Sequence, residues 1–309
     1  MNRPRARRTE SDDELFRLFD ERSHQAAVKW GDAIGNLTMA ESPRPVLDRN
    51  YHTHTYRCQH AKGDCIDYAR VAHGLGMQVL GFSDHTPLPD GRWGNVRMGL
   101  EQLDDYERAV ALAREGFPDL RVLLGMECEY TPAFRAFFED ELLGNRGYDY
   151  LIGAGHYIGV DDSWYGAFDH AVAPKNLRHY VDQVVATIDC GLFAFIAHPD
   201  LYGCCNYLWN ADCALAARDI CQAAVAEDIP LELNGYGMRK PWIDTPVGRR
   251  AMYPWLPFWE IAAEEEVKTI INSDAHRPDD VGYGRAELGP MRERLGLEEV
   301  DLLERLANP

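Results

Sequence analysis

Several features that would place this chain in a common class are missing from its sequence. No apolar run approaches the roughly 18 residues that a membrane-spanning helix needs. The basic start, residues 1–8, is not followed by an apolar stretch of signal-peptide length. The eight cysteines form no CxxC pair and no regular framework, which argues against a disulfide scaffold or a cysteine-rich zinc module. We therefore expect a cytoplasmic protein whose thiols are reduced.

Nucleotide-binding motifs and excess positive charge are missing as well. The chain contains neither GxGxxG nor a P-loop, so no motif supports a nucleotide-binding sheet. The 32 basic residues are outnumbered by 50 acidic ones, which leaves a formal net charge of −18. An acidic surface repels nucleic acid backbones and anionic membranes, so we expect neither as a partner. A phosphorylated substrate would need a local cationic site, and metal ions would supply one.

What the chain does contain is an alternation of short apolar runs with stretches of helical spacing. The expected strands are 46–51, 79–83, 121–126, 150–155, 193–197, 231–233 and 268–272. The expected helices are 65–75, 103–115, 177–189, 215–226, 258–266 and a closing helix at 295–306. Strands that alternate with helices predict βα units and a parallel sheet, and therefore an α/β fold.

The chain divides into an extension and one large unit. Residues 1–45 form the extension, for which Leu15, Phe16, Leu18 and Phe19 give a helix-like apolar spacing. Residues 46–309 carry the alternating pattern, and the chain, 46% hydrophobic, is long enough for one large core.

Metal-binding side chains gather at the carboxyl ends of these strands. His52 and His54 are separated by one residue, which puts both imidazoles on the same face of a strand. Seven of the eleven histidines follow this pattern, and one acid ends each of two strands. The candidate ligands are His52, His54, His60, His85, Glu127, His156, His198, Asp274 and His276. In (β/α) barrels the carboxyl ends of the strands carry the active site.

Nine mixed nitrogen and oxygen ligands are too many for one ion. They suit two or three divalent ions that share a bridging carboxylate, and imidazole with carboxylate accepts zinc, manganese or iron. Clusters of this kind activate water and clamp the oxygens of a phosphoryl group. We expect His24, His73, His170 and His179 to lie outside the site, although His170 is in a loop that could reach it.

The ordered motifs resemble those of the PHP (polymerase and histidinol phosphatase) superfamily, and specifically its histidinol-phosphate phosphatase branch. The matching pieces are His52-Thr53-His54 with His60, Phe82-Ser83-Asp84-His85, Gly125-Met126-Glu127, Gly155-His156-Tyr157, Ala197-His198-Pro199, Leu231-Glu232-Leu233-Asn234 with Gly237-Met238-Arg239-Lys240, and Ser273-Asp274-Ala275-His276. They run in family order from about residue 46 to about residue 285.

The resemblance implies a distorted (β/α)7 TIM-like barrel with a trinuclear metal centre. One ion would take His52, His54, Glu127 and Asp274; a second would share Glu127 and add His156 and His198; a third would take His60, His85 and His276. The resemblance also implies that Arg239 meets phosphate, which suits a guanidinium group. The chain departs from the family pattern at Asn50, where an aspartate is usual, and in the loops 160–174 and 201–210.

These features together predict a phosphomonoester hydrolase that uses a metal-bridging hydroxide, with Glu127, Asp274 and Arg239 as catalytic residues. The leading substrate is L-histidinol phosphate, a step of histidine biosynthesis that yields L-histidinol and phosphate. Its amine and imidazole end would need an acid or aromatic contact. Candidates for that contact are Glu129, Asp161, Asp162, Trp164, Asp200 and Tyr202.

Two alternatives stay open from the sequence. One is a PHP-type phosphoesterase that acts on another small phosphorylated metabolite, a nucleotide or a phosphodiester. The other is a regulatory protein that binds metal without catalysis, which metal analysis and a substrate panel would distinguish. The expected partner is a small phosphorylated metabolite, and the sequence does not indicate an oligomeric state.

Overall fold

The computed structural model describes residues 45–307. The strands are β1 Arg49–Asn50, β2 Val79–His85, β3 Arg121–Glu129, β4 Tyr150–Ala154, β5 Tyr157–Val160, β6 Ser163–Gly166, β7 Leu231–Asn234, β8 Ile243–Thr245, β9 Gly248–Arg250 and β10 Thr269–Asn272. The helices are α2 Cys65–Gly74, α3 Leu103–Gly116, α4 Leu177–Asp189, α5 Ala211–Ala226, α6 Gly235–Arg239, α7 Leu256–Glu264, α8 Arg285–Leu295 and α9 Leu302–Ala307. All but the last residue of the expected extension lies outside the described residues.

The central strands are parallel and curl around a common interior. A four-stranded sheet runs in the order β1-β2-β3-β4, and β7 pairs separately with β10. Single bridges join the two sheets: Ile196 pairs with Gly153 on one side and Leu231 on the other, and Thr53 pairs with Ala275. The structure therefore confirms a mixed α/β fold with a curled parallel sheet.

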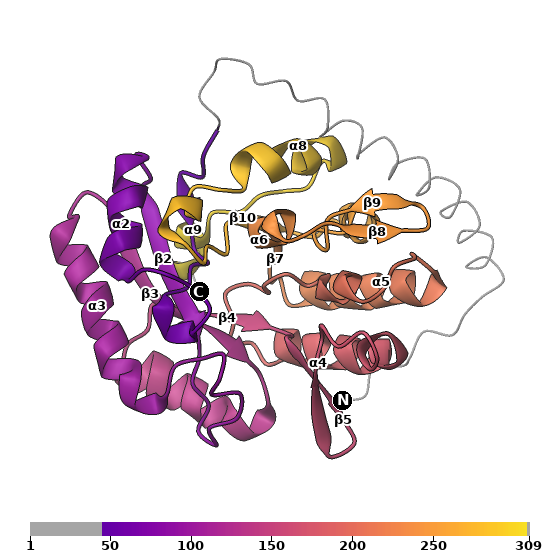
Figure 1. Ribbon diagram of the computed structural model, residues 1–309, viewed down its shortest axis with the longest axis horizontal. Helices are drawn as coiled ribbons and strands as arrows, with labels where there is room; N and C mark the ends of the chain where they lie inside the picture. Colours follow the sequence, from indigo (N-terminus) through magenta and orange to yellow (C-terminus); the bar gives the residue numbers. More distant parts are fainter. Residues whose placement is uncertain (1–44, 308–309) are drawn as a thin grey trace.

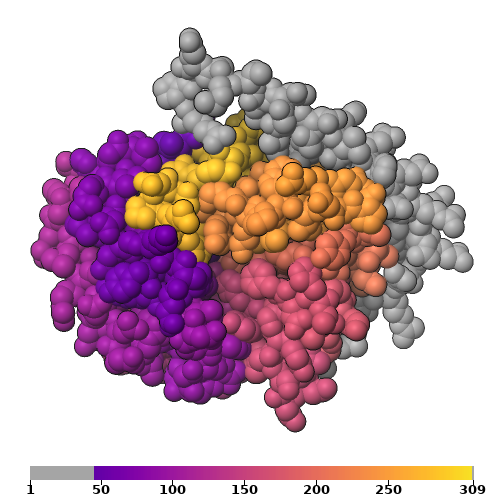
Figure 2. Space-filling view, in the orientation of Figure 1, coloured from indigo at the N-terminus to yellow at the C-terminus, as the bar shows by residue number. Residues whose placement is uncertain are grey.

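Helices cover the outer face of the sheet (Figure 1). Helices α2 and α3 pack together beside β2 and β3, while α4, α5 and α7 pack in succession on the far side. Figure 2 shows early residues in indigo, residues near 165 in red and the last segments in orange and yellow meeting on one face of the molecule. Chain segments that are distant in sequence therefore build this face together.

Side chains of β3 alternate between two apolar clusters. Val122 and Leu124 pack outward against the helices, whereas Leu123 packs inward with Tyr150 of β4. A parallel strand that is buried on both faces needs apolar residues on both faces. The sequences of these strands are therefore continuous apolar runs. Side chains of a strand alternate between its two faces, so Glu127 points inward like Leu123. Glu127 lies near the carboxyl end of β3.

Tyr150 fills the interior below the carboxyl ends of the strands. Its hydroxyl group donates to the carbonyl of Tyr51 at 2.7 Å, and its ring lies against Gly81 and Gly125. A Cβ atom at Gly125 would come within 2.6 Å of Tyr150 Cζ. Glycine on β2 and β3 therefore makes room for the tyrosine that supports the floor of the site.

Some expected elements differ from those observed. The segment 193–197 lies between β4 and β7 and hydrogen-bonds to both: Ala194 and Ala197 donate to the carbonyls of Leu151 and Gly153, and Glu232 donates to that of Ile196. Bends on both sides of Ile196 keep it from being a continuous strand. A closing helix is present, but its expected start at residue 295 is wrong: α8 ends at Leu295, Gly296 follows with a φ of 68°, and the closing helix α9 starts at Leu302. Two antiparallel hairpins, β5–β6 and β8–β9, occupy loops after central strands. Among the described residues, no helix combines the length and apolarity needed to cross a membrane.

Candidate metal centre

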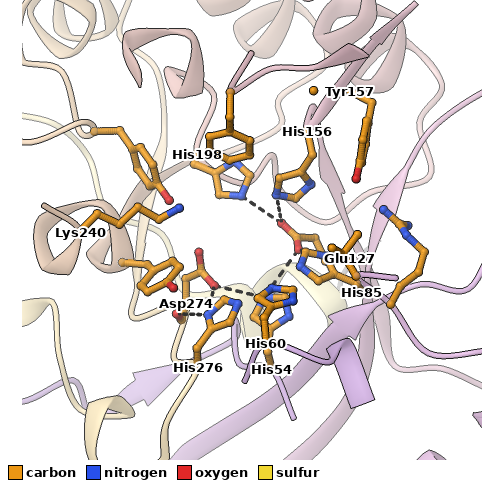
Figure 3. A pocket seen from close by; sticks show the side chains of 16 residues that line it. His54, His60, His85, Glu127, His156, Tyr157, His198, Lys240, Asp274 and His276 are labelled. Carbon is orange, nitrogen blue, oxygen red and sulfur yellow. Dashed lines mark hydrogen bonds and ion pairs between the residues drawn. The ribbon is translucent and has the colours of Figure 1, made fainter. Parts of the chain in front are cut away.

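The structure brings all nine predicted ligands together at the carboxyl ends of the central strands. His52 and His54 follow β1, His60 follows a short 3-10 turn, and His85 and Glu127 lie in β2 and β3. His156 follows β4, and His198 follows the bridge at Ile196. Asp274 and His276 follow β10. Eight of the nine line a cavity of about 250 Å³, and Figure 3 shows them pointing into it. His52 lies beneath them and is fully buried.

One group surrounds Oδ1 of Asp274. The Nε2 atoms of His52 and His54 lie 3.1 Å from each other and 3.6 and 3.1 Å from this oxygen. His52 Nε2 is also 3.4 Å from Oε1 of Glu127. These four residues are the set that the resemblance assigns to one ion.

Glu127 lies between several imidazoles. Its Oε1 atom lies 3.0 Å from His198 Nε2 and 3.6 Å from His156 Nε2. Its Oε2 atom lies 2.8 Å from His85 Nδ1 and 3.6 Å from His54 Nε2. Because its two oxygens face different histidines, the side chain has the position that a bridging carboxylate requires.

The third group consists of imidazole rings that lie close together. The ring of His276 lies 4.3 Å from that of His54 and 4.9 Å from that of His60, centroid to centroid, and His60 lies 5.3 Å from His85. Burial, followed by the charge of His54, lowers the pKa of His60 and of His276, and burial lowers that of His85. Neutral imidazoles are the form that binds metal ions.

Electrostatics and unsatisfied atoms fit divalent ions at this cluster. Burial by itself would raise the pKa of Glu127 and Asp274, but the adjacent imidazoles hold both well below their usual values. Glu127 Oε2 and Asp274 Oδ1 are buried without a hydrogen-bond partner among the described residues, although imidazole nitrogens lie 2.8 and 3.1 Å away. Buried oxygens of this kind are normally hydrogen-bonded or bound to a cation. The donor set of nitrogen and oxygen therefore suits divalent metal ions.

Arg239 lies outside the cavity. One Nη atom donates to the carbonyls of Ser273 and Asp274 at 2.9 and 3.1 Å, and Nε lies 3.4 Å from Asp280. It is not among the residues that line the cavity, so contact with phosphate stays a prediction. Its observed role is to hold the backbone that carries Asp274.

Lys240, the next residue, does line the cavity, and its ammonium group extends into it (Figure 3). The Nζ atom lies over the rings of Tyr236, Phe168 and Tyr253 at 4.7, 4.9 and 5.5 Å from their centroids. No carboxylate within residues 45–307 forms an ion pair with it. Sequence reasoning missed this residue, although it stands beside Arg239 in the motif.

The loop residues expected to meet the substrate amine have other contacts. Glu129 pairs with His156, Asp200 accepts from the Trp259 indole at 3.0 Å, and Tyr202 is buried under the loop. Trp164 lies against Trp93, and Asp161 and Asp162 form the turn between β5 and β6. None of these six lines the cavity. Its wall is instead aromatic, formed by Tyr157, Phe168, Tyr236 and Tyr253.

Asn50 connects two parts of the site. Its amide donates to Ser273 Oγ at 2.6 Å and its carbonyl oxygen accepts from the Ser273 amide at 3.0 Å. An asparagine makes both contacts, so the departure from the usual aspartate is compatible with this site. His73, on α2, and His170, beside Tyr207, do not line the cavity.

Comparison with known proteins gives a consistent result. The model of the PHP domain matches residues 50–235. The chain is 32% identical over 245 residues to the “Probable histidinol-phosphatase” of Deinococcus radiodurans, covering 76% of this chain and 89% of that protein. It is 26% identical over 267 residues to the histidinol-phosphatase of Bacillus subtilis, covering 76% and 96%.

A solved structure shares the fold. The histidinol phosphate phosphatase of Lactococcus lactis, determined with zinc, L-histidinol and phosphate, superposes with a TM-score of 0.62 at 13% identity and covers 84% of this chain and 96% of its own. The family model spans more than half of the chain, and the Deinococcus relative aligns over most of its length. This chain therefore belongs to the PHP domain family.

Proposed function

We propose that this protein is a metal-dependent phosphomonoester hydrolase and that its substrate is L-histidinol phosphate. The observation that carries the proposal is the cluster of nine ligand residues, seven of them buried, open to a cavity that also receives Lys240. Two relatives that align over most of their length are named histidinol-phosphatases, which supports the substrate. We also propose that the single bridges at Ile196 and Thr53 complete a distorted seven-stranded barrel around this site.

The chain itself provides binding, charge and orientation. Divalent ions held by the nine residues would supply an activated water and positive charge for the phosphoryl oxygens. Glu127 would hold two of the ions at a set separation, since its two oxygens face different imidazoles. Lys240 would meet a phosphate oxygen from the aromatic side of the cavity with a charge-assisted hydrogen bond.

The remainder of the substrate would lie against the aromatic wall. Tyr157 stacks on Trp93 with ring centroids 3.8 Å apart and planes 7° apart, which fixes its orientation beside the cavity. A protonated amine or an imidazole is attracted to the face of such rings. Recognition of the organic group therefore rests on aromatic contact, because the acids among the residues that line the cavity are Glu127 and Asp274.

A substrate panel tests the function. Protein loaded with zinc or with manganese would be assayed with L-histidinol phosphate, p-nitrophenyl phosphate, a sugar phosphate, a nucleotide and a phosphodiester. We expect L-histidinol phosphate to have the highest kcat/KM with both metals. A clear preference for a nucleotide or a diester would contradict the substrate, and no hydrolysis by fully loaded protein would favour a metal-binding regulatory protein.

A further inference from the structure

A fully buried carboxylate outside the predicted ligand set lies directly behind the metal centre. Glu232, on β7, is 0% exposed and accepts hydrogen bonds from four N–H groups. The donors are His52 Nδ1 at 2.8 Å, the His198 amide at 3.1 Å, the Asn234 side chain at 2.8 Å and the Asn272 side chain at 3.0 Å. A carboxylate accepts all four because it has about four lone-pair sites and no proton of its own.

The contact with His52 determines which ring nitrogen faces the centre. Because a carboxylate can only accept, Nδ1 of His52 donates to Glu232 and carries a proton, which leaves Nε2 as the ring atom that could bind a cation. This Nε2 is the atom that lies 3.1 Å from His54 Nε2 and 3.4 Å from Glu127. A negative charge behind the ring also increases the electron density that the ring offers to a cation.

The second oxygen of Glu232, Oε2, contacts the backbone of His198. This residue has a φ of 29°, a left-handed value that costs energy for a side chain other than glycine. The Oε2 atom accepts from its amide, and the His198 imidazole then lies 3.0 Å from Glu127. One carboxylate therefore orients two histidines whose Nε2 atoms both face Oε1 of Glu127.

Two asparagines hold the carboxylate in place. Asn234 and Asn272 are paired residues of β7 and β10, and each amide donates to one oxygen of Glu232. A glutamine at this position would turn its own side-chain NH₂ group toward some of the N–H groups that now donate to Glu232, and two donors cannot form a hydrogen bond. The position therefore requires an ionised acid and not merely a residue of that size.

The same arrangement recurs at a second histidine, where Glu129 contacts His156 Nδ1 and accepts from the His156 amide at 3.2 Å. We propose that Glu232 is a positioning residue of the metal centre, which sets the tautomer of His52 and the backbone of His198 and so strengthens metal binding. The proposal rests on the metal-binding part of the proposed function and is independent of the substrate.

The zinc-loaded wild-type protein gives the first test. Long-range ¹H–¹⁵N correlation spectra of protein labelled at histidine report which ring nitrogen carries the proton, and the His52→Asn spectrum assigns the signal. We expect His52 to be protonated at Nδ1 with Nε2 bare. A proton on Nε2 with a bare Nδ1 would overturn the proposal, whatever the variants below do.

Zinc affinity gives the second test, measured by competition with a chromophoric chelator. Glu232→Gln is expected to bind zinc about 10- to 100-fold more weakly than wild type. Asp200→Asn is the matched control, since Asp200 is 1% exposed and accepts from the Trp259 indole but contacts none of the nine ligand side chains. The control should bind zinc as wild type does.

Unchanged affinity in Glu232→Gln, or an equal loss in Asp200→Asn, would show that Glu232 serves only the fold. Should Glu232→Gln not fold, Glu232→Asp keeps the charge at a shorter reach, and we expect its affinity to fall between wild type and a tenfold loss; wild-type affinity in that variant would contradict the proposal. Failure of the substrate panel with intact zinc binding would instead reject the phosphatase function and leave this inference standing.

Discussion

The Nε2 atoms of His52 and His54 face each other at 3.1 Å, deep in the molecule and beside Oδ1 of Asp274. Two bare lone pairs repel at this distance, and two protonated nitrogens repel more strongly. A single proton or a cation between them removes the repulsion. A bound ion would also satisfy Asp274 Oδ1, which is buried without a hydrogen-bond partner among the described residues.

Metal removal should therefore lower stability. Exhaustive treatment with a chelator is expected to reduce the thermal midpoint, and zinc or manganese should restore it. The expected gain is about 2.7 kcal/mol when free metal exceeds its Kd a hundredfold. Scanning calorimetry of chelated and reloaded protein measures the difference. Equal midpoints in the two samples would argue against a metal site.

Replacement of Glu127 and replacement of Glu129 should reduce the bound metal by different amounts. Glu127→Gln is expected to reduce bound metal by more than one ion, because its two oxygens face His85 and His198. Glu129→Gln should weaken binding only through His156, since its carboxylate pairs with that ring. Elemental analysis after dialysis compares them. A greater loss of metal from Glu129→Gln would identify Glu129 as the bridging acid.

Lys240→Met should weaken substrate and phosphate binding without loss of metal. Methionine keeps an unbranched apolar side chain but removes the ammonium group that lies over the Tyr236 ring. We expect kcat/KM to fall by about 1.5–3 kcal/mol, the range for a hydrogen bond to a charged group, and phosphate inhibition to weaken. Lys268→Met is the control, because Lys268 pairs with Asp228 at the surface. Unchanged inhibition in Lys240→Met would contradict the assignment.

Arg239→Ala distinguishes two roles for the neighbouring cation. The sequence predicts weaker phosphate inhibition with intact metal content. The hydrogen bonds to the Ser273 and Asp274 carbonyls instead predict lower metal content, because the backbone of Asp274 loses its support. Metal content and the inhibition constant for phosphate, measured on one preparation, decide between the two.

Gly125→Ala should destabilise the protein without touching a ligand. The new methyl group would lie 2.6 Å from Tyr150 Cζ, and overpacking of this kind costs about 1–3 kcal/mol. Gly74→Ala is the control, since nothing lies within 4 Å of its added Cβ atom. Urea denaturation of the two variants gives the free energies of unfolding. Equal stability would show that Tyr150 shifts at little cost.

Local pattern was sufficient to predict most elements. The helix expected at 177–189 is confirmed as α4, and β3 and β10 start within one residue of the predicted strands. Apolar periodicity is a local property, so it can be recognised in the sequence before the fold is known. The segment 193–197 does hydrogen-bond to the neighbouring strands β4 and β7, as expected of a strand, but bends on both sides of Ile196 interrupt it. Apolar composition alone does not predict such bends.

The sequence by itself determined the candidate ligands, because the ends of parallel strands must meet at one edge of a sheet, and His52, Glu127 and Asp274 stand at such ends. Only the tertiary structure decided which of two adjacent cations, Arg239 or Lys240, lines the cavity. Arg239 and Lys240 are adjacent in the chain, yet Arg239 turns toward the carbonyls of the Asp274 loop and Lys240 toward the cavity. Only the fold likewise brings Glu232 beneath His52, 180 residues earlier in the chain. Side-chain direction and contacts across such separations depend on packing, which no local pattern encodes.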